Sequence, residues 1–486
     1  MIRRVIVSGF EFFNFSFGKS WGFLMSSRTL PDFGRGREGL KSSGLRIGVV
    51  VALAFLSILD PIGWISVGPF FHGSVWSQDQ NPGASRPSNS ALTPEERQIR
   101  KQAKEEAAQK AQQYRLETYG VIPPTDEAPL AVAYRQSFEA FRKASTDYAV
   151  AHFRIQYRLK ETITDEMREN WLKFLEQSSK ALIEYRERAV DLYESDPKKY
   201  SSVGLMLREM LTVDGELDRF DHWSRGARVL LDAKDHVDNS VLLYAGYVGF
   251  ADCDFELARR AWGELANAGK LEPQEARMLD ELPKIEESWK RELELREQDK
   301  SKNNPRVEIL TTKGAIVVEL FEDEAPESVA SFIYLVENSY YTRKPFFLVK
   351  SHWLAQTGCE KGDGKGNAGF TINSEAENPN KRDHFRGSIS MPVGVDPKTG
   401  EVAYNSGGSQ FYFSYVPLPI VDGRHTVFGR VVSGSEVLGM LKVINLTDEE
   451  QRKNHSLKPD TIIRAKVLTK RDHAYRPTPV FGKLPR

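Results

Sequence analysis

The pattern of apolar and polar residues changes character near the N-terminus. Residues 47–59 (IGVVVALAFLSIL) form an uncharged apolar run behind a basic leader, and a looser apolar stretch continues to residue 71. The run is too short to cross about 30 Å of hydrocarbon as a helix and fits the apolar part of a secretory signal. Residues 1–77 are therefore predicted to be an export leader, either cleaved or retained as a membrane anchor through residues 47–71. The chain is expected in the periplasm or the cell envelope.

Residues 78–92 are rich in Pro, Ser and Asn, which predicts a disordered linker. A helix start follows at Thr93, where a threonine N-cap precedes a proline at the first helical position. Beyond residue 123, apolar residues recur at helical spacing, and one helix is expected to begin near Asp165. Further helices are predicted at about 199–212, 217–233, 239–252, 255–268 and 273–304. Residues 93–304 are thus predicted to form a helical domain of hairpins.

One helical pair, LLYAGYVGFADCDFELARRAWGELANAG, has small and aromatic residues at characteristic positions. Gly246, Ala258 and Trp262 occupy the small, small and aromatic positions of a tetratricopeptide repeat, which this pair resembles. Gly249 stands where an aromatic is usual, and no two further clear copies follow, although stacked repeats need about three. The sequence leaves open whether the helices bind a protein partner or form a plain scaffold.

At Pro305 the periodicity changes from that of helices to that of strands. Residues 307–311 and 315–321 flank the turn signal Thr312-Lys313-Gly314. Helices are predicted from Pro326 and over 435–444, and a last strand over 461–468. Many short strands with two helices predict a closed antiparallel β-barrel capped by helices over residues 305–470. Residues 471–486 form a basic tail.

Composition excludes several classes of function. The 486 residues contain 67 Lys plus Arg and 67 Asp plus Glu, so no net charge favours nucleic acid. Cys253 and Cys359 lie far apart and have no CxxC spacing, so they form neither a zinc site nor a disulfide framework by themselves. The glycine run at 362–366 does not join a buried strand to a helix, as a phosphate loop must. No metal, cofactor or nucleic acid is expected.

Five segments of the C-terminal part carry a family resemblance: TTKGAIVVELFEDEAPESVASFIYLV, GDGKGNAGFTINSE, RGSISM, GGSQFYF and VDGRHTVFGRVVSG. Together they resemble the cyclophilin family of peptidyl-prolyl cis-trans isomerases across residues 306–468. That family rotates the peptide bond before proline, which has a barrier of about 18–20 kcal/mol. The reaction needs an apolar pocket for the proline ring and a donor aimed at the prolyl nitrogen, whose lone pair emerges as conjugation is lost.

The resemblance implies a set of substrate-binding positions. Trp353 and Leu354 take the family's phenylalanine and methionine positions, and Gln356 takes that of the glutamine that binds the substrate carbonyl. The remaining implied positions are Gln410 and Phe411 on the strand behind the site, Tyr412 for the second pocket phenylalanine, Val421 for the pocket leucine and His425 for the pocket histidine. For Phe411 and Leu354, the open alternative is a place in the barrel core. For His425, the open alternative is a buried histidine whose hydrogen bonds are satisfied within the protein.

The position of the hydrogen-bond donor to the prolyl nitrogen departs from the family pattern. Leu348 occupies the position of the catalytic arginine, and Lys350, two residues on along the same strand, is the candidate substitute. Pro392-Val393 replace the usual Ala-Asn, and the loop 394–407 is longer than typical. One hypothesis is an isomerase for X-Pro bonds of exported proteins, weak because the arginine is missing. The alternative is a non-catalytic module that binds proline-containing peptides on a helical scaffold in an envelope assembly.

Overall fold

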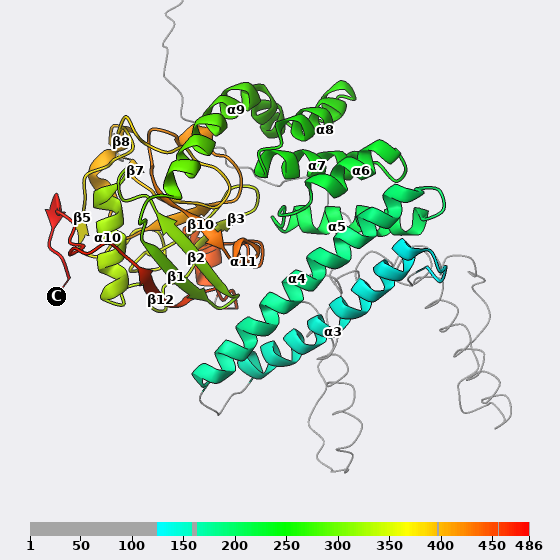
Figure 1. Ribbon diagram of the computed structural model, residues 1–486. Helices are drawn as coiled ribbons and strands as arrows, with labels where there is room; N and C mark the ends of the chain where they lie inside the picture. The colour runs from blue at the N-terminus through cyan, green and yellow to red at the C-terminus, as the bar shows by residue number, and fades with distance from the viewer. Residues whose placement is uncertain (1–123, 158–162, 396–397, 455, 486) are drawn as a thin grey trace, which may run out of the picture. The chain divides into compact units, whose positions relative to one another are not determined.

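The computed structural model describes residues 124–157, 163–395, 398–454 and 456–485 (Figure 1). The predicted leader, the linker and the helix expected after Thr93 lie outside these residues. The described residues belong to one compact unit of the chain. Within them, no helix combines the length and the apolar character needed to cross a membrane.

Helices fill the described chain before the first strand. The caps follow the sequence: Thr164 Oγ1 accepts a hydrogen bond from the Met167 N–H at 3.3 Å, and Asp238 and Asp254 cap two later helices in the same way. The helix expected near Asp165 begins there. The helices are α3 (Pro129–Tyr157), α4 (Asp165–Ser195), α5 (Ser201–Glu216), α6 (Ser224–Ala233), α7 (Asn239–Ala251), α8 (Phe255–Asn267) and α9 (Pro273–Asp299).

The α7–α8 pair is packed too closely to admit larger residues at its glycines. A Cβ on Gly246 would lie 2.1 Å from Trp262 Nε1, and one on Gly249 would lie 2.5 Å from the Ala258 nitrogen. Trp262 Nε1 also donates a hydrogen bond to the Leu243 carbonyl at 3.1 Å. The small and aromatic residues noted in the sequence thus form one tight hairpin, while tetratricopeptide character stays a prediction.

The C-terminal part is built on an antiparallel sheet of nine strands in the described residues, in the order β11-β3-β4-β9-β6-β10-β2-β1-β12. Its strands are β1 (Arg306–Thr311), β2 (Ala315–Leu320), β3 (Leu348–Lys350), β4 (Leu354–Thr357), β6 (Ser388–Met391), β9 (Phe411–Ser414), β10 (Thr426–Ser433), β11 (Ile444–Asn445) and β12 (Ile462–Thr469). Two short pairs stand apart: β5 (Phe370–Thr371) with β13 (Phe481–Gly482), and β7 (Gly394–Val395) with β8 (Val402–Ala403) in the loop predicted to be long.

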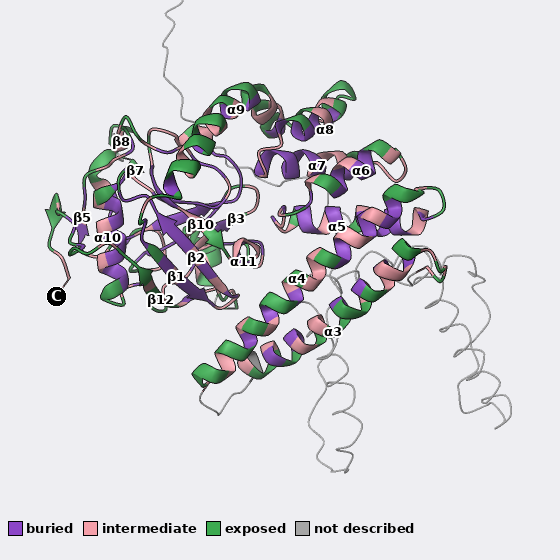
Figure 2. Ribbon diagram, viewed as in Figure 1, coloured by how far each residue is buried: buried purple, intermediate pink, exposed green. Residues whose placement is uncertain are grey.

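The sheet is curled, and its core lies on the inner side. Val329, Phe332 and Ile333 of α10 (Pro326–Glu337) are buried in one core cluster with strand residues that include Phe411 and Phe413. Figure 2 shows buried stretches both on α10 and on the strands of the sheet. The edge strands β11 and β12 share no ladder in the described residues. The segment just before β3 is joined to the start of β12 by the isolated bridge Pro345–Thr461 and by backbone hydrogen bonds such as Arg343 N–H to the Ile462 carbonyl. The sheet is therefore a half-barrel, and full closure stays a prediction.

The second capping helix is shorter than predicted. The structure has α11 over Ser435–Leu438, whereas the sequence predicts a helix to residue 444. The chain leaves the helix at Gly439 because Ile444 pairs with Val349 in the edge ladder of β11 with β3. A short α12 (Glu449–Lys453) follows. Tertiary pairing thus overrides the local helical pattern.

Candidate functional site: an outer face of β3, β4 and β9

Strand register brings the predicted pocket residues to one face of the sheet. Directly opposed residues of antiparallel strands point to the same side. Leu348 opposes Gln356, and Gln356 opposes Tyr412, so these three share a face. Leu354, two residues before Gln356, lies on that face as well. We call Leu348, Leu354, Gln356 and Tyr412 the outer face of β3, β4 and β9.

Phe411 points the other way. Its ring packs edge-to-face at 5.2 Å from the rings of both Phe332 and Tyr341, and only 1% of the residue is exposed. Phe411 is thus part of the sheet core and does not reach the outer face. The structure therefore shows the core role that the sequence left open for Phe411.

Two amides form a clamp at one end of the outer face. Gln356 Nε2 donates to Gln410 Oε1 at 2.9 Å, and Gln410 Nε2 donates to the carbonyls of Gly364 and Gly366 at 2.9 and 2.8 Å. The glycine run therefore orients Gln410, which in turn orients Gln356. Among the described residues, no donor bonds to Gln356 Oε1, so this oxygen is free to accept a hydrogen bond from a peptide.

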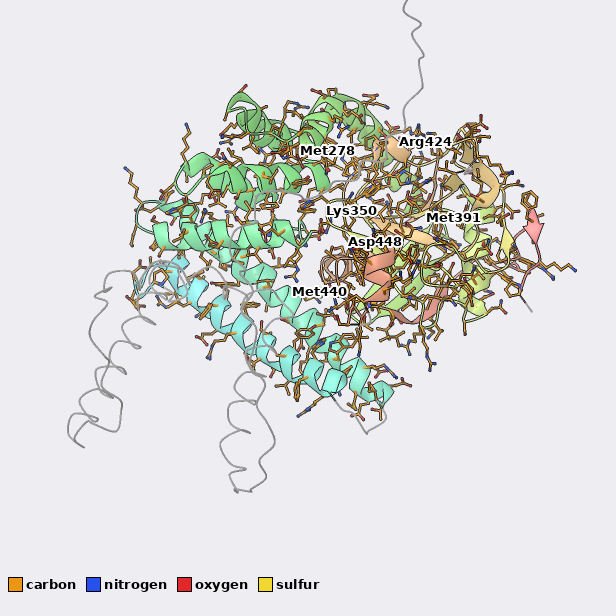
Figure 3. The ribbon with its side chains drawn as sticks, turned by 180° about the vertical axis from the view of Figure 1, so that it is seen from behind. Met278, Lys350, Met391, Arg424, Met440 and Asp448 are labelled. Carbon is orange, nitrogen blue, oxygen red and sulfur yellow. The ribbon has the colours of Figure 1, made fainter. Side chains whose placement is uncertain are left out.

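Apolar residues form the other end of the outer face of β3, β4 and β9. Leu354, Tyr412 and the half-buried Val421 belong to one apolar cluster, which continues into the helices. Trp353, 36% exposed, lies in the turn just before Leu354, and Lys350 Nζ lies 4.5 Å from the centre of its indole ring. Lys350 is labelled in Figure 3 on its strand. The structure thus brings every predicted pocket residue except Phe411 to this side of the sheet.

His425 enters the site through a hydrogen-bonded chain. The Tyr412 hydroxyl lies 2.9 Å from His425 Nδ1 and 2.9 Å from His384 Nε2, and His384 Nδ1 lies 2.6 Å from Asp422 Oδ1. Sequence reasoning missed His384 and Asp422. The available signal was the tyrosine at 412 where phenylalanine is expected, because a buried phenolic hydroxyl normally finds a partner.

Burial sets the protonation state of two residues of this hydrogen-bonded series, His425 and Tyr412. Burial, followed by repulsion from His384 and Arg424, lowers the pKa of His425 to about 4. Burial also raises the pKa of the Tyr412 hydroxyl well above its ordinary value. At neutral pH, His425 is therefore an uncharged ring with one N–H, and Tyr412 keeps its proton.

The pKa of His425 predicts a loss of stability in acid. Its ordinary pKa is 6.5, so between pH 6.5 and 4 the unfolded chain binds a proton that the folded chain does not. The free energy of unfolding should therefore fall as the pH falls, by about 2 kcal/mol from this group between pH 7 and pH 5. Urea unfolding of the full chain and of His425→Gln at both pH values tests this. Equal losses in the two proteins would contradict the assignment.

The turn that carries Trp353 is anchored in the helices. The ring of His352 stacks on Tyr247 with centres 4.1 Å apart, and its Nε2 lies 3.0 Å from the Gly215 carbonyl. The backbone N–H of His352 donates to Asp218 Oδ1 at 2.7 Å. Helices α5 and α7 thus hold the turn beside the outer face, a role that the sequence did not indicate.

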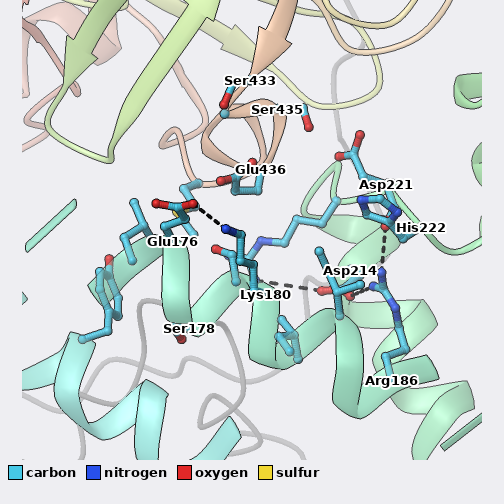
Figure 4. Close-up of a pocket in the computed structure, with 18 residues that line it drawn as sticks. Glu176, Ser178, Lys180, Arg186, Asp214, Asp221, His222, Ser433, Ser435 and Glu436 are labelled. Atoms are coloured by element: carbon cyan, nitrogen blue, oxygen red, sulfur yellow. Dashed lines mark hydrogen bonds and ion pairs between the residues drawn. The ribbon is translucent and has the colours of Figure 1, made fainter. Parts of the chain in front are cut away.

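A cavity of about 300 Å³ between α4 and the residues of α11 is lined by none of the predicted site residues (Figure 4). Leu175 and Met440 supply part of its apolar lining, and its charged side chains include Arg186 and Asp214, 3.5 Å apart. Because none of the predicted pocket residues reaches this cavity, it is not the candidate site for a prolyl ring.

Comparison with known proteins identifies the C-terminal part. Residues 306–467 match the family described as cyclophilin type peptidyl-prolyl cis-trans isomerase/CLD. A peptidyl-prolyl cis-trans isomerase of Helicobacter pylori (strain ATCC 700392 / 26695) is 42% identical over 137 residues, which are 28% of this chain and 78% of that protein. The peptidyl-prolyl cis-trans isomerase B of Bacillus subtilis (strain 168) is 36% identical over 128 residues, 26% of this chain and 83% of that protein.

A solved structure of a Cryptosporidium parvum cyclophilin type peptidyl-prolyl cis-trans isomerase, obtained in the presence of the dipeptide Ala-Pro, is 26% identical, with a TM-score of 0.27. The match covers 34% of this chain and 99% of that one. The sequence relatives define the class, a prolyl isomerase with an added helical region. The chain belongs to the cyclophilin-type peptidyl-prolyl cis-trans isomerase family.

Proposed function

We propose that the chain accelerates cis-trans interconversion of X-Pro peptide bonds at the outer face of β3, β4 and β9. The observation that carries the proposal is the register Leu348–Gln356–Tyr412, which places an apolar floor and an oriented amide side by side. Leu354, Tyr412 and Val421 would hold the proline ring, and Gln356 would bind the peptide backbone.

We propose that turnover is weak, because Leu348 supplies no hydrogen-bond donor to the prolyl nitrogen. Losing one preorganised donor costs on the order of 10²- to 10³-fold in rate. The same leucine supports the second candidate function, a silent module that binds proline-containing peptides. Removing the X-Pro bond from water still favours the twisted amide relative to the planar one, so we favour residual catalysis.

The test is an NMR exchange assay of a short Ala-Pro peptide with the full chain. We expect acceleration by the wild type and a loss of about tenfold in Gln356→Leu, since one hydrogen bond to the substrate is worth about 1.4 kcal/mol. Gln177→Leu, on the exposed side of α4, is the matched control and should match the wild type. Peptide binding without acceleration would select the silent module, and no binding at all would overturn both functions.

Lys350 is the proposed substitute donor. It lies two residues after Leu348 on the same side of β3 and is held beside Trp353 by the cation–π contact. Lys350→Met is expected to lower the residual exchange rate at least threefold without changing peptide affinity, because the donor acts mainly in the transition state. An unchanged rate in Lys350→Met would rule out this role.

The site of action is proposed to be outside the cytoplasm, on exported polypeptides. The apolar run 47–59 behind a basic leader supports export, and the helices offer a docking arm for a protein partner. The N-terminal sequence of the mature protein, isolated from the cells that make it, tests this. A start near Gln78 would support cleavage, whereas an intact leader in a membrane fraction would support an anchor. An intact leader in the soluble cytoplasmic fraction would contradict export.

A further inference from the structure

The turn between β4 and β5 contacts the amide pair of the outer face of β3, β4 and β9. Gln410 Nε2 donates to the carbonyls of Gly364 and Gly366 at 2.9 and 2.8 Å, and Gln410 Oε1 accepts from Gln356 Nε2 at 2.9 Å. We call residues 359–366 the glycine turn. The orientation of Gln356 therefore depends on where two carbonyls of the glycine turn lie.

Counting hydrogens shows what these two carbonyls determine. A carbonyl only accepts, so Gln410 must face them with its NH2 group, and both hydrogens of that group are used. The oxygen of Gln410 then faces Gln356, which must present its own NH2 group. Gln356 keeps Oε1 and one N–H for a bound peptide. If the carbonyl of Gly364 or Gly366 turned away, either amide could rotate by about 180° and this polarity would be lost.

Asp363 fixes the direction of the first carbonyl. Its Oδ1 accepts a hydrogen bond from the Lys365 N–H at 2.9 Å. That N–H and the Gly364 carbonyl belong to the same planar trans peptide group, in which they point in opposite directions. Holding the N–H toward Asp363 thus holds the carbonyl toward Gln410.

Cys359 fixes the backbone at the second carbonyl. Its Sγ accepts a hydrogen bond from the Gly366 N–H at 3.2 Å, and its S–H donates to Asp363 Oδ1 at 3.7 Å. Cys359 is fully buried, and a Cβ on Gly366 would lie only 2.8 Å from the Lys361 nitrogen, so the backbone here has little room to move. Arg452 of α12 adds an ion pair with Asp363 Oδ2 at 3.6 Å.

We propose that Asp363 and Cys359 are positioning residues for Gln356. They hold the glycine turn, the glycine turn orients Gln410, and Gln410 orients the amide that meets the peptide. This role depends on the proposed function, because Gln356 is the residue proposed to bind the peptide backbone. Since Gln356 would bind the ground state and the transition state alike, loss of its orientation should raise KM more than it lowers kcat.

The first test is NMR of the full chain without peptide, which measures how fast the side-chain NH2 hydrogens of Gln410 exchange with water. We expect exchange about tenfold faster in Asp363→Ala than in the wild type, since a hydrogen bond worth about 1.4 kcal/mol is lost. Asp363→Asn is the matched variant and should resemble the wild type. It keeps an oxygen for the Lys365 N–H and loses only the partly exposed ion pair with Arg452.

Cys359 provides a second pair of variants. Cys359→Ser keeps an acceptor for the Gly366 N–H, whereas Cys359→Ala leaves that N–H without a partner. Exchange at Gln410 should therefore be faster in Cys359→Ala than in Cys359→Ser. Circular dichroism checks that all variants are folded.

The second test is a double-mutant cycle read as kcat/KM on an Ala-Pro peptide. Asp363→Ala should lower kcat/KM about fivefold, less than the loss of about tenfold expected for Gln356→Leu. In the Gln356→Leu background, Asp363→Ala should cause no further loss, because the amide that it positions is gone. A side chain that only stabilised the fold would cause the same loss in both backgrounds.

Two results would overturn the inference: equal Gln410 exchange rates in the wild type and Asp363→Ala, or an equal loss of kcat/KM in the wild-type and Gln356→Leu backgrounds. The exchange measurement needs no peptide, so it separates this inference from the proposed function. If Gln410 responds to Asp363→Ala as expected but no peptide is bound or isomerised, the positioning of the amides stands and the proposed function fails.

Discussion

Replacing Leu348 with arginine is expected to raise kcat/KM for an X-Pro peptide about 10²- to 10³-fold, the effect of one preorganised donor. The position suits a donor, because Leu348 is half-buried and directly opposes Gln356 on the neighbouring strand. A guanidinium there would point to the same side as the oriented amide. It would stabilise the prolyl nitrogen lone pair only once conjugation is lost, so the gain should appear in kcat more than in peptide affinity.

Leu348→Met is the matched control, since it keeps an apolar side chain of similar volume and adds no donor. Its rate should equal that of the wild type in the same exchange assay. If Leu348→Arg also equals the wild type while peptide still binds, the prolyl nitrogen does not lie over β3, and the placement of the substrate is wrong.

Replacing Arg382 with methionine is expected to lower the free energy of unfolding by about 3–5 kcal/mol, the cost of removing one partner of a buried ion pair. Its guanidinium is fully buried and contacts Glu292 at 3.2 Å, Asp299 at 2.7 Å and Glu324 at 3.3 Å. Each of these carboxylates is itself at most 5% exposed. Without Arg382, they lose their most central cation.

Urea unfolding of the full chain measures this effect, with Arg424→Met as a control at an exposed arginine. A difference below about 0.5 kcal/mol between the two variants would contradict a structural role for the cluster. Because Glu292 and Asp299 belong to α9, cutting the chain at residue 300 would remove two of the three carboxylates. Activity assays therefore need the full chain and not the sheet alone.

Local features were predictable from the sequence. The cap at Thr164 and the apolar spacing that follows define the start of α4, and the switch of periodicity at Pro305 precedes β1 at Arg306. The family resemblance placed Gln356, Tyr412 and His425 near one another, and strand register and the Tyr412–His425 hydrogen bond account for that proximity. These features depend on residues close in sequence or on a fold shared with relatives.

Contacts between distant segments were not predictable. His352 bonds to Asp218, 134 residues earlier, and Arg382 to Asp299, 83 residues earlier. No periodicity links such positions, since each contact depends on how the helices pack against the sheet. The helix expected to reach residue 444 ends early for the same reason, because pairing of β11 with β3 competes with a weak local preference.

The most direct test of the central claim is a crystal structure of the full chain with an Ala-Pro peptide. The account predicts the proline ring against Leu354, Tyr412 and Val421, with a peptide backbone group bonded to Gln356 and His425 Nε2 facing the peptide. A ring bound elsewhere, for example in the cavity between α4 and α11, with the outer face of β3, β4 and β9 empty, would contradict it.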